Sequence, residues 1–68
     1  MTYEEHADAI EAHVKEAALD TQLPEDVVWH DVTVAYLITE VDDLTMRVQL
    51  ARGHGIPLDM VGFPMGVV

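Results

Sequence analysis

Two of the four histidines in this chain fall on one predicted helix, and histidine is suited to bind a metal ion or to transfer a proton. His6 and His13 are seven residues apart with Glu16 nearby, and zinc accepts imidazole and carboxylate ligands. Seven helical residues span about 10 Å, too far for both rings to share one ion. We expect no cofactor and no metal site here, although a His-dependent metal-binding protein using His6, His13 and His54 is an alternative.

Catalysis by a nucleophile has little support in the sequence. The chain contains no serine and no cysteine, the usual nucleophiles of covalent catalysis. His30 and Asp31 could form a base with its orienting carboxylate, but neighbours on a strand point to opposite faces. His54 lies between Gly53 and Gly55, and two glycines alone do not form a phosphate-binding loop. We expect a protein that is not an enzyme.

A predicted helix over residues 2–20 would position His6 and His13. Thr2 and Glu5 have the spacing of a capping box, and acidic residues crowd the first half, where the helix dipole favours them. Its predicted apolar stripe consists of Tyr3, Ala7, Ile10, Val14 and Ala17.

The second element is a predicted β-hairpin over residues 32–51. The run Val32–Val41 is rich in β-branched residues, and apolar side chains alternate strictly with polar ones after Asp42 and Asp43. The first strand is apolar on both faces, so it needs a second cover. A homodimer would provide this cover. The alternative is that Trp29 and the C-terminal tail cover the face within one chain.

The C-terminal region is a predicted turn and tail over residues 56–68. Proline suits the first position of a helix, so Pro57 should open a short helical turn. We therefore predict an α+β fold in one domain over residues 1–68, with the N-terminal amphipathic helix packed on the hairpin.

An all-α fold that resembles a degenerate helix-turn-helix is the alternative. In it, Asp43 caps a helix over residues 44–53 and a recognition helix follows Pro57. Gly62 and Pro64 would shorten that recognition helix to about one turn. The spacing behind this alternative comes from Leu50, Ala51, Gly55, Ile56 and Val61.

The charge of the chain is strongly negative and unevenly distributed. Thirteen acidic residues face three basic ones, for a formal charge of −10, and residues 44–68 carry only one of the acids. Such a chain repels nucleic acid and attracts a basic protein surface, although acidity also keeps a small protein in solution. No apolar run is long enough to span a membrane, and we expect a cytoplasmic location.

These observations predict a non-enzymatic acidic protein-binding module. A nucleic-acid-mimicking inhibitor is the alternative in which the carboxylates imitate phosphates. The predicted acidic face consists of Glu4, Glu5, Asp8 and Glu11. The predicted apolar contacts, with a partner or a second copy, are Trp29, Tyr36, Phe63 and Met65.

The order of helix, acidic linker, hairpin and glycine-containing tail resembles small uncharacterised accessory proteins of actinobacterial phages. Trp29, Val32–Val41, and Gly55-Ile56-Pro57 followed by Gly62-Phe63 carry this resemblance over about half of the chain. It implies a phage accessory protein that acts by binding, and no functional residue is transferred from it.

Overall fold

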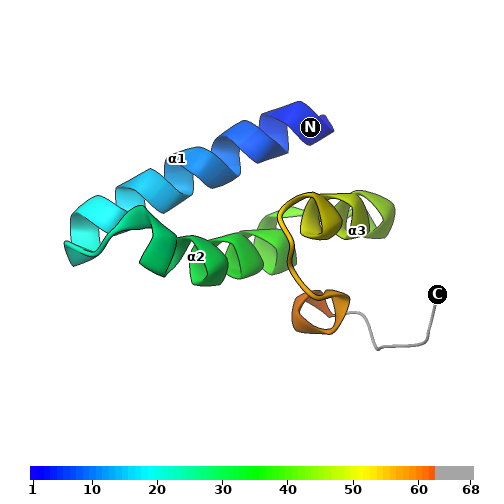
Figure 1. The fold of residues 1–68 in the computed structure, drawn as a ribbon. Helices are drawn as coiled ribbons and strands as arrows, with labels where there is room; N and C mark the ends of the chain where they lie inside the picture. The colour runs from blue at the N-terminus through cyan, green and yellow to red at the C-terminus, as the bar shows by residue number, and fades with distance from the viewer. Residues whose placement is uncertain (63–68) are drawn as a thin grey trace. The chain divides into compact units, whose positions relative to one another are not determined.

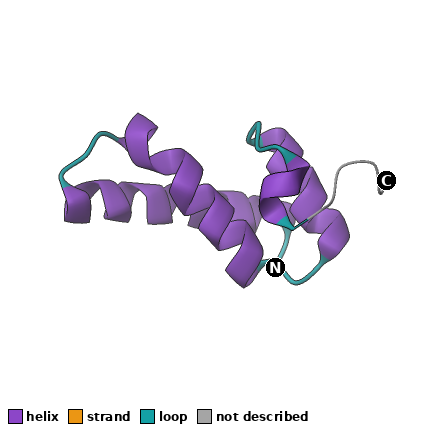
Figure 2. Cartoon of the chain, turned by 90° about the horizontal axis from the view of Figure 1, so that it is seen from below, coloured by secondary structure: helices purple, strands orange, loops and turns teal. Residues whose placement is uncertain are grey.

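The structure is a computed structural model that describes residues 1–62, and every element in that range is helical (Figures 1 and 2). The order is α1 (Tyr3–Thr21), α2 (Glu25–Glu40), α3 (Leu44–Gly53) and η1, a 3₁₀ turn (Leu58–Val61). The prediction of an α+β fold with a hairpin over residues 32–51 is therefore wrong. The all-α alternative agrees with the structure.

The chain divides into two compact units, residues 1–33 and residues 34–68. The boundary falls within α2, so that each unit contains part of that helix. We call them the first unit and the second unit. The expectation of a single domain over residues 1–68 stays a prediction.

Local signals in the sequence account for both ends of α1. The Thr2 hydroxyl accepts a hydrogen bond from the Glu5 backbone N–H at 3.2 Å, and the Glu5 carboxylate accepts one from the Thr2 N–H at 3.4 Å. This capping box satisfies amides that have no partner within the helix. The helix ends at Gln22, whose φ of 59° is left-handed, a conformation that commonly terminates helices.

The run predicted as the first strand is instead part of α2. The buried side chains of α2 are Val28, Thr33, Tyr36 and Leu37. Their spacing does not follow the alternation of a strand. The Thr39 hydroxyl donates to the Ala35 carbonyl, four residues earlier, at 2.7 Å, as helical geometry allows. β-Branched residues disfavour a helix by less than about 1 kcal/mol each, a preference that packing of the buried side chains outweighs.

The run predicted as the second strand is α3, and Asp42 and Asp43, which the hairpin prediction placed between its two strands, immediately precede that helix. Asp43 is the N-cap, with its carboxylate accepting from the Met46 N–H at 3.1 Å. As a strand, this run would place Leu44 and Leu50 on the same apolar face. In the structure Leu44 is 57% exposed whereas Leu50 is fully buried. Residues 32–51 contain no strand, so they provide no doubly apolar strand for a second copy to cover.

The end of α3 is closed by a Schellman motif. The Ile56 N–H donates to the Ala51 carbonyl at 2.7 Å and the Gly55 N–H to the Arg52 carbonyl at 3.2 Å. Gly55 has a φ of 72°, which glycine adopts without steric cost. Between Pro57 and residue 62 the one element is η1, and it packs against α3. One such turn leaves no recognition helix among the described residues.

Arg47 connects separate parts of the second unit through three hydrogen bonds. Its Nε and Nη2 donate to the Val41 carbonyl at 3.1 and 2.8 Å, and its Nη1 donates to the Val61 carbonyl at 3.3 Å. The guanidinium thus joins the segment before α3 to the end of η1. Both Val41 and Val61 are almost fully buried, so these carbonyls need a donor from the protein.

Candidate functional site

The predicted acidic face is an exposed stripe along α1. Glu4, Asp8 and Glu11 are four and three residues apart and lie on one side of the helix. Glu5 lies off this stripe and takes part in the capping box. Glu11 forms an ion pair with Lys15 at 3.1 Å. Within residues 1–62 the side chains of Glu4 and Asp8 form no ion pair, which leaves them available to a partner.

The predicted apolar contacts are divided by the structure. Tyr36 is only 6% exposed, and burial, with a smaller effect from Glu40, raises the pKa of its phenol. Trp29 is half-buried, with its ring edge-on to His30 at 5.6 Å between centroids. Trp29 could therefore contribute contact area at its exposed part, whereas Tyr36 belongs to the interior. Phe63 and Met65 lie outside the described residues.

The histidines are not brought together as a metal centre. Within the part of the chain that the structure describes, no three His, Asp or Glu side chains are grouped closely enough to hold a metal ion. His6 is buried on α1 beside the predicted apolar stripe. On the exposed surface, the His13 Nδ1–H donates to the Ala9 carbonyl at 2.7 Å. His54 caps the end of α3.

His30 and Asp31 are closer than a strand would allow. On α2 the His30 Nδ1 lies 3.6 Å from an Asp31 carboxylate oxygen, and the Asp31 side chain is 94% exposed. The expectation that these neighbours point to opposite faces was wrong because the segment is helical. A carboxylate so open to water orients a ring only weakly, and the chain has no serine or cysteine for such a base to activate.

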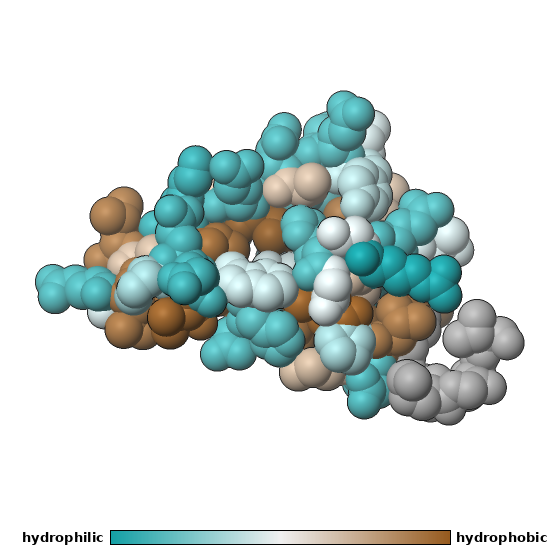
Figure 3. Space-filling model, viewed as in Figure 1, coloured by the Kyte–Doolittle hydropathy of each residue, from teal (hydrophilic) through white to brown (hydrophobic). Residues whose placement is uncertain are grey.

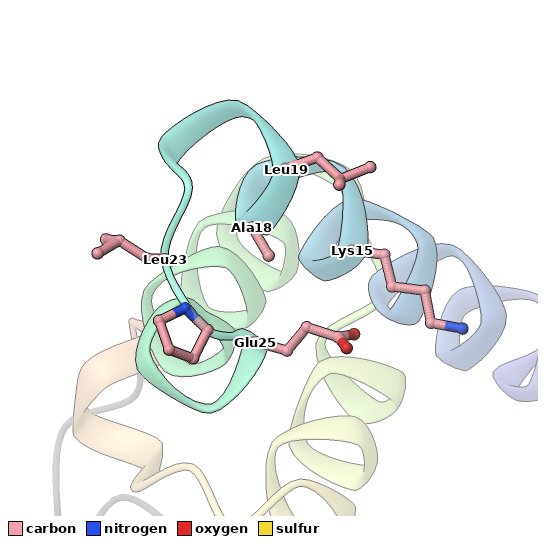
Figure 4. Close-up of a pocket in the computed structure, with 6 residues that line it drawn as sticks. Lys15, Ala18, Leu19, Leu23 and Glu25 are labelled. Atoms are coloured by element: carbon pink, nitrogen blue, oxygen red, sulfur yellow. The ribbon is translucent and has the colours of Figure 1, made fainter.

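The sequence did not reveal a pocket at the turn between α1 and α2 (Figure 4). Its volume is about 440 Å³, within the range of about 300 to 1,000 Å³ that is common for binding pockets. Its lining comes entirely from the first unit and consists of Lys15, Ala18, Leu19, Leu23, Pro24 and Glu25.

Two large apolar side chains make this pocket unusual for a surface turn. Leu19 is 81% exposed and Leu23 is 47% exposed. In Figure 3, hydrophobic residues gather over the turn between α1 and α2, whereas hydrophilic residues cover the visible face of α1. Two features of the sequence could have indicated this pocket: Leu19 lies outside the apolar stripe of its own helix, and the connector that follows contains a second leucine, Leu23.

The electrostatic surroundings of the pocket are acidic. The last turn of α1 contains no basic residue, so its carbonyl groups keep the partial negative charge of a helix C-terminus. Lys15 is the one lysine of the first unit, which contains no arginine. The hydrogen bond and charge of Glu11, with a smaller contribution from Glu25, raise the pKa of the Lys15 ammonium. Lys15 is therefore already paired with a carboxylate of the protein itself.

The described residues contain no helix that is both long enough and apolar enough to cross a membrane. What the first unit offers is an arrangement for contact: open carboxylates, a shallow apolar pocket and a half-buried tryptophan. Comparison of the chain with protein-family models, curated proteins and solved structures found no match.

Proposed function

We propose that this chain is a non-enzymatic acidic protein-binding module whose first unit binds a basic surface of another protein. The observation that carries this proposal is the exposure of every carboxylate of the first unit. Nine Asp and Glu residues occur in residues 1–33 against Lys15, and all nine are exposed. They are Glu4, Glu5, Asp8, Glu11, Glu16, Asp20, Glu25, Asp26 and Asp31.

A surface of this kind attracts positively charged groups but does not stabilise the fold. Exposed carboxylates without partners repel one another and contribute nothing to packing, whereas a basic partner would remove that repulsion on binding. Three exposed apolar side chains of the same unit, Leu19, Leu23 and Val27, would add contact area that charge alone lacks. The cytoplasmic location expected from the sequence remains part of this proposal, as does an accessory role in a phage.

The proposal is tested by capturing proteins on the immobilised full chain and measuring the affinity of the captured partner across a salt series. We expect a basic partner whose Kd rises at least about tenfold between about 0.05 and 0.3 M salt, since salt screens charges exposed to solvent. A Kd that is unchanged by salt would contradict the proposal.

Matched charge variants localise the effect to one unit. Glu4→Gln, Asp8→Asn and Asp20→Asn together remove three carboxylates from the first unit without touching the capping box or the Lys15 ion pair. Glu40→Gln, Asp42→Asn and Asp59→Asn remove three from the second unit. We expect the first triple variant to weaken binding and the second to leave it nearly unchanged. If duplex DNA displaced the captured partner, the chain would be acting as a nucleic-acid mimic.

We also propose self-association, now on grounds other than a hairpin. The second unit leaves three large apolar side chains partly in solvent: Ile38, Leu44 and Met60, each more than 40% exposed. Small chains commonly gain stability by covering such side chains in a dimer. Light scattering coupled to size exclusion measures the mass directly, and a monomer at all accessible concentrations would refute a homodimer.

A further inference from the structure

The pocket at the turn between α1 and α2 exposes apolar surface that the first unit does not cover itself. Leu19 projects from the last part of α1, and Leu23 precedes Pro24 in the connector (Figure 4). Covering a leucine that is exposed to solvent is favourable because it removes apolar surface from water. A side chain from another molecule would cover part of that surface by entering here.

The charges around the pocket restrict what this other molecule can be. Between residues 15 and 26 four exposed carboxylates stand against the single ammonium of Lys15, which Glu11 already engages at 3.1 Å. The carbonyl groups at the end of α1, with no basic residue in the last turn, add negative charge. Glu25 itself lines the pocket. An occupant with positive charges beside its apolar group is therefore favoured over a neutral or acidic one.

We propose that this pocket receives an apolar side chain from a basic amphipathic helix of the partner protein. The inference rests on the proposed function and adds the chemistry of the partner. A helix places basic residues three and four positions away beside its apolar side chain. A strand would turn the immediate neighbours of that side chain to the opposite face. A strand keeps only its second neighbours on that face, in line with the apolar group, whereas a helix places basic residues on several sides of it, where they reach the carboxylates around the pocket.

The probe for this proposal is a synthetic helical peptide of about 18 residues, with leucine on one face, lysine on the other and a fluorescent label. Fluorescence anisotropy measures its affinity for the full chain. We expect saturable binding that weakens with added salt. A peptide with the same lysines but serine in place of leucine should bind at least about fivefold more weakly. One with glutamate in place of lysine should not bind.

Variants of the chain test whether the peptide binds in the pocket. Leu19→Ser and Leu23→Ser should each weaken binding at least about fivefold, and neither side chain is buried, so the fold should persist. Tyr3→Ser is the control, because Tyr3 is also exposed, lies at the other end of α1 and does not line the pocket. Lys15→Gln should tighten binding about twofold, since it removes the one positive charge at the pocket.

The outcomes separate this proposal from the broader one. Binding that is lost in the first-unit charge variant but unchanged by Leu19→Ser and Leu23→Ser would overturn the pocket and leave the acidic module intact. Equal binding of the lysine and glutamate peptides would overturn both. A chain that is dimeric by light scattering and becomes monomeric with Leu19→Ser would show that a second copy fills the pocket, and would overturn the basic helix as its occupant.

Discussion

The two units of this small chain treat their apolar and charged residues differently. In the first unit Leu19, Leu23 and Val27 remain partly or largely in solvent, and nine exposed carboxylates stand against the one ammonium of Lys15. In the second unit Leu37, Leu50 and Val61 are completely buried, and Arg47 uses its donors on backbone carbonyls. The difference is one of degree, since the first unit also buries Ile10 and the second also exposes Leu44, but the completely buried apolar side chains lie in the second unit and the most exposed leucine lies in the first. The comparison separates stability from recognition, and it can be tested by mutation.

The largest difference is expected between two leucines on helices of the two units. Leu50→Ala leaves a cavity in the interior and should reduce the free energy of unfolding by about 2 to 5 kcal/mol. Leu19→Ala should change it by less than about 0.5 kcal/mol, because Leu19 is 81% exposed. Urea unfolding followed by circular dichroism measures both. Ile56→Val, expected to lose about 0.5 to 1.5 kcal/mol, serves if Leu50→Ala does not fold, and equal losses for both leucines would break the comparison.

The next effect concerns the hydrogen bonds of Arg47. Arg47→Met keeps much of the side-chain volume but leaves the Val41 and Val61 carbonyls without this donor. We expect a loss of about 1 to 3 kcal/mol in the free energy of unfolding. Arg52→Met is the control, since Arg52 is exposed on the same helix. A loss of similar size in the control would show that positive charge on α3, rather than the bonds to these carbonyls, matters.

Helix caps should behave alike in the two units. Thr2→Ala removes the cap of α1 and Asp43→Ala that of α3, and each should reduce the free energy of unfolding by about 1 kcal/mol. The effect is local to the first turn, so burial elsewhere should not change it. Thermal unfolding of the two variants side by side measures this. A much larger effect at Asp43 would indicate that its carboxylate does more than accept from the Met46 N–H.

The smallest expected effect is a gain of stability in the first unit. Gln22 ends α1 with a φ of 59°, where a side chain costs about 1 to 2 kcal/mol and glycine costs nothing in steric terms. The greater freedom of unfolded glycine offsets part of this, so Gln22→Gly should stabilise the protein by about 0.5 to 1 kcal/mol. Gln22→Ala should bring no gain. Urea unfolding that shows no difference between the two variants would mean that α1 frays before this position.

Local signals in the sequence predicted the ends of elements better than their type. The capping box of Thr2 and Glu5 is present, and η1 follows Pro57 where a short turn was expected. The hairpin failed because β-branched residues and short alternating runs are compatible with a strand and also with a buried helix. Asp43 lay between the two strands in the hairpin prediction and capped a helix in the all-α alternative. The structure shows the cap.

For the candidate site, the sequence indicated the charge and the tertiary structure provided the shape. Exposed carboxylates on α1 follow from composition, because such groups are rarely buried without a partner. The pocket could not be predicted in this way, since it depends on how the connector brings Leu23 and Pro24 back beside Lys15 and Leu19. Tyr36, predicted to contact a partner, is instead buried on α2.

The sequence by itself thus determined the net charge, the helix caps and the absence of thiol or serine chemistry, all of which depend on residue identity and near neighbours. Only the tertiary structure decided whether residues 32–51 are strand or helix, and which apolar side chains are buried. The physical reason is that intrinsic backbone preferences amount to less than about 1 kcal/mol per residue. Burial of one large apolar side chain contributes more than that, and it depends on residues distant in the sequence.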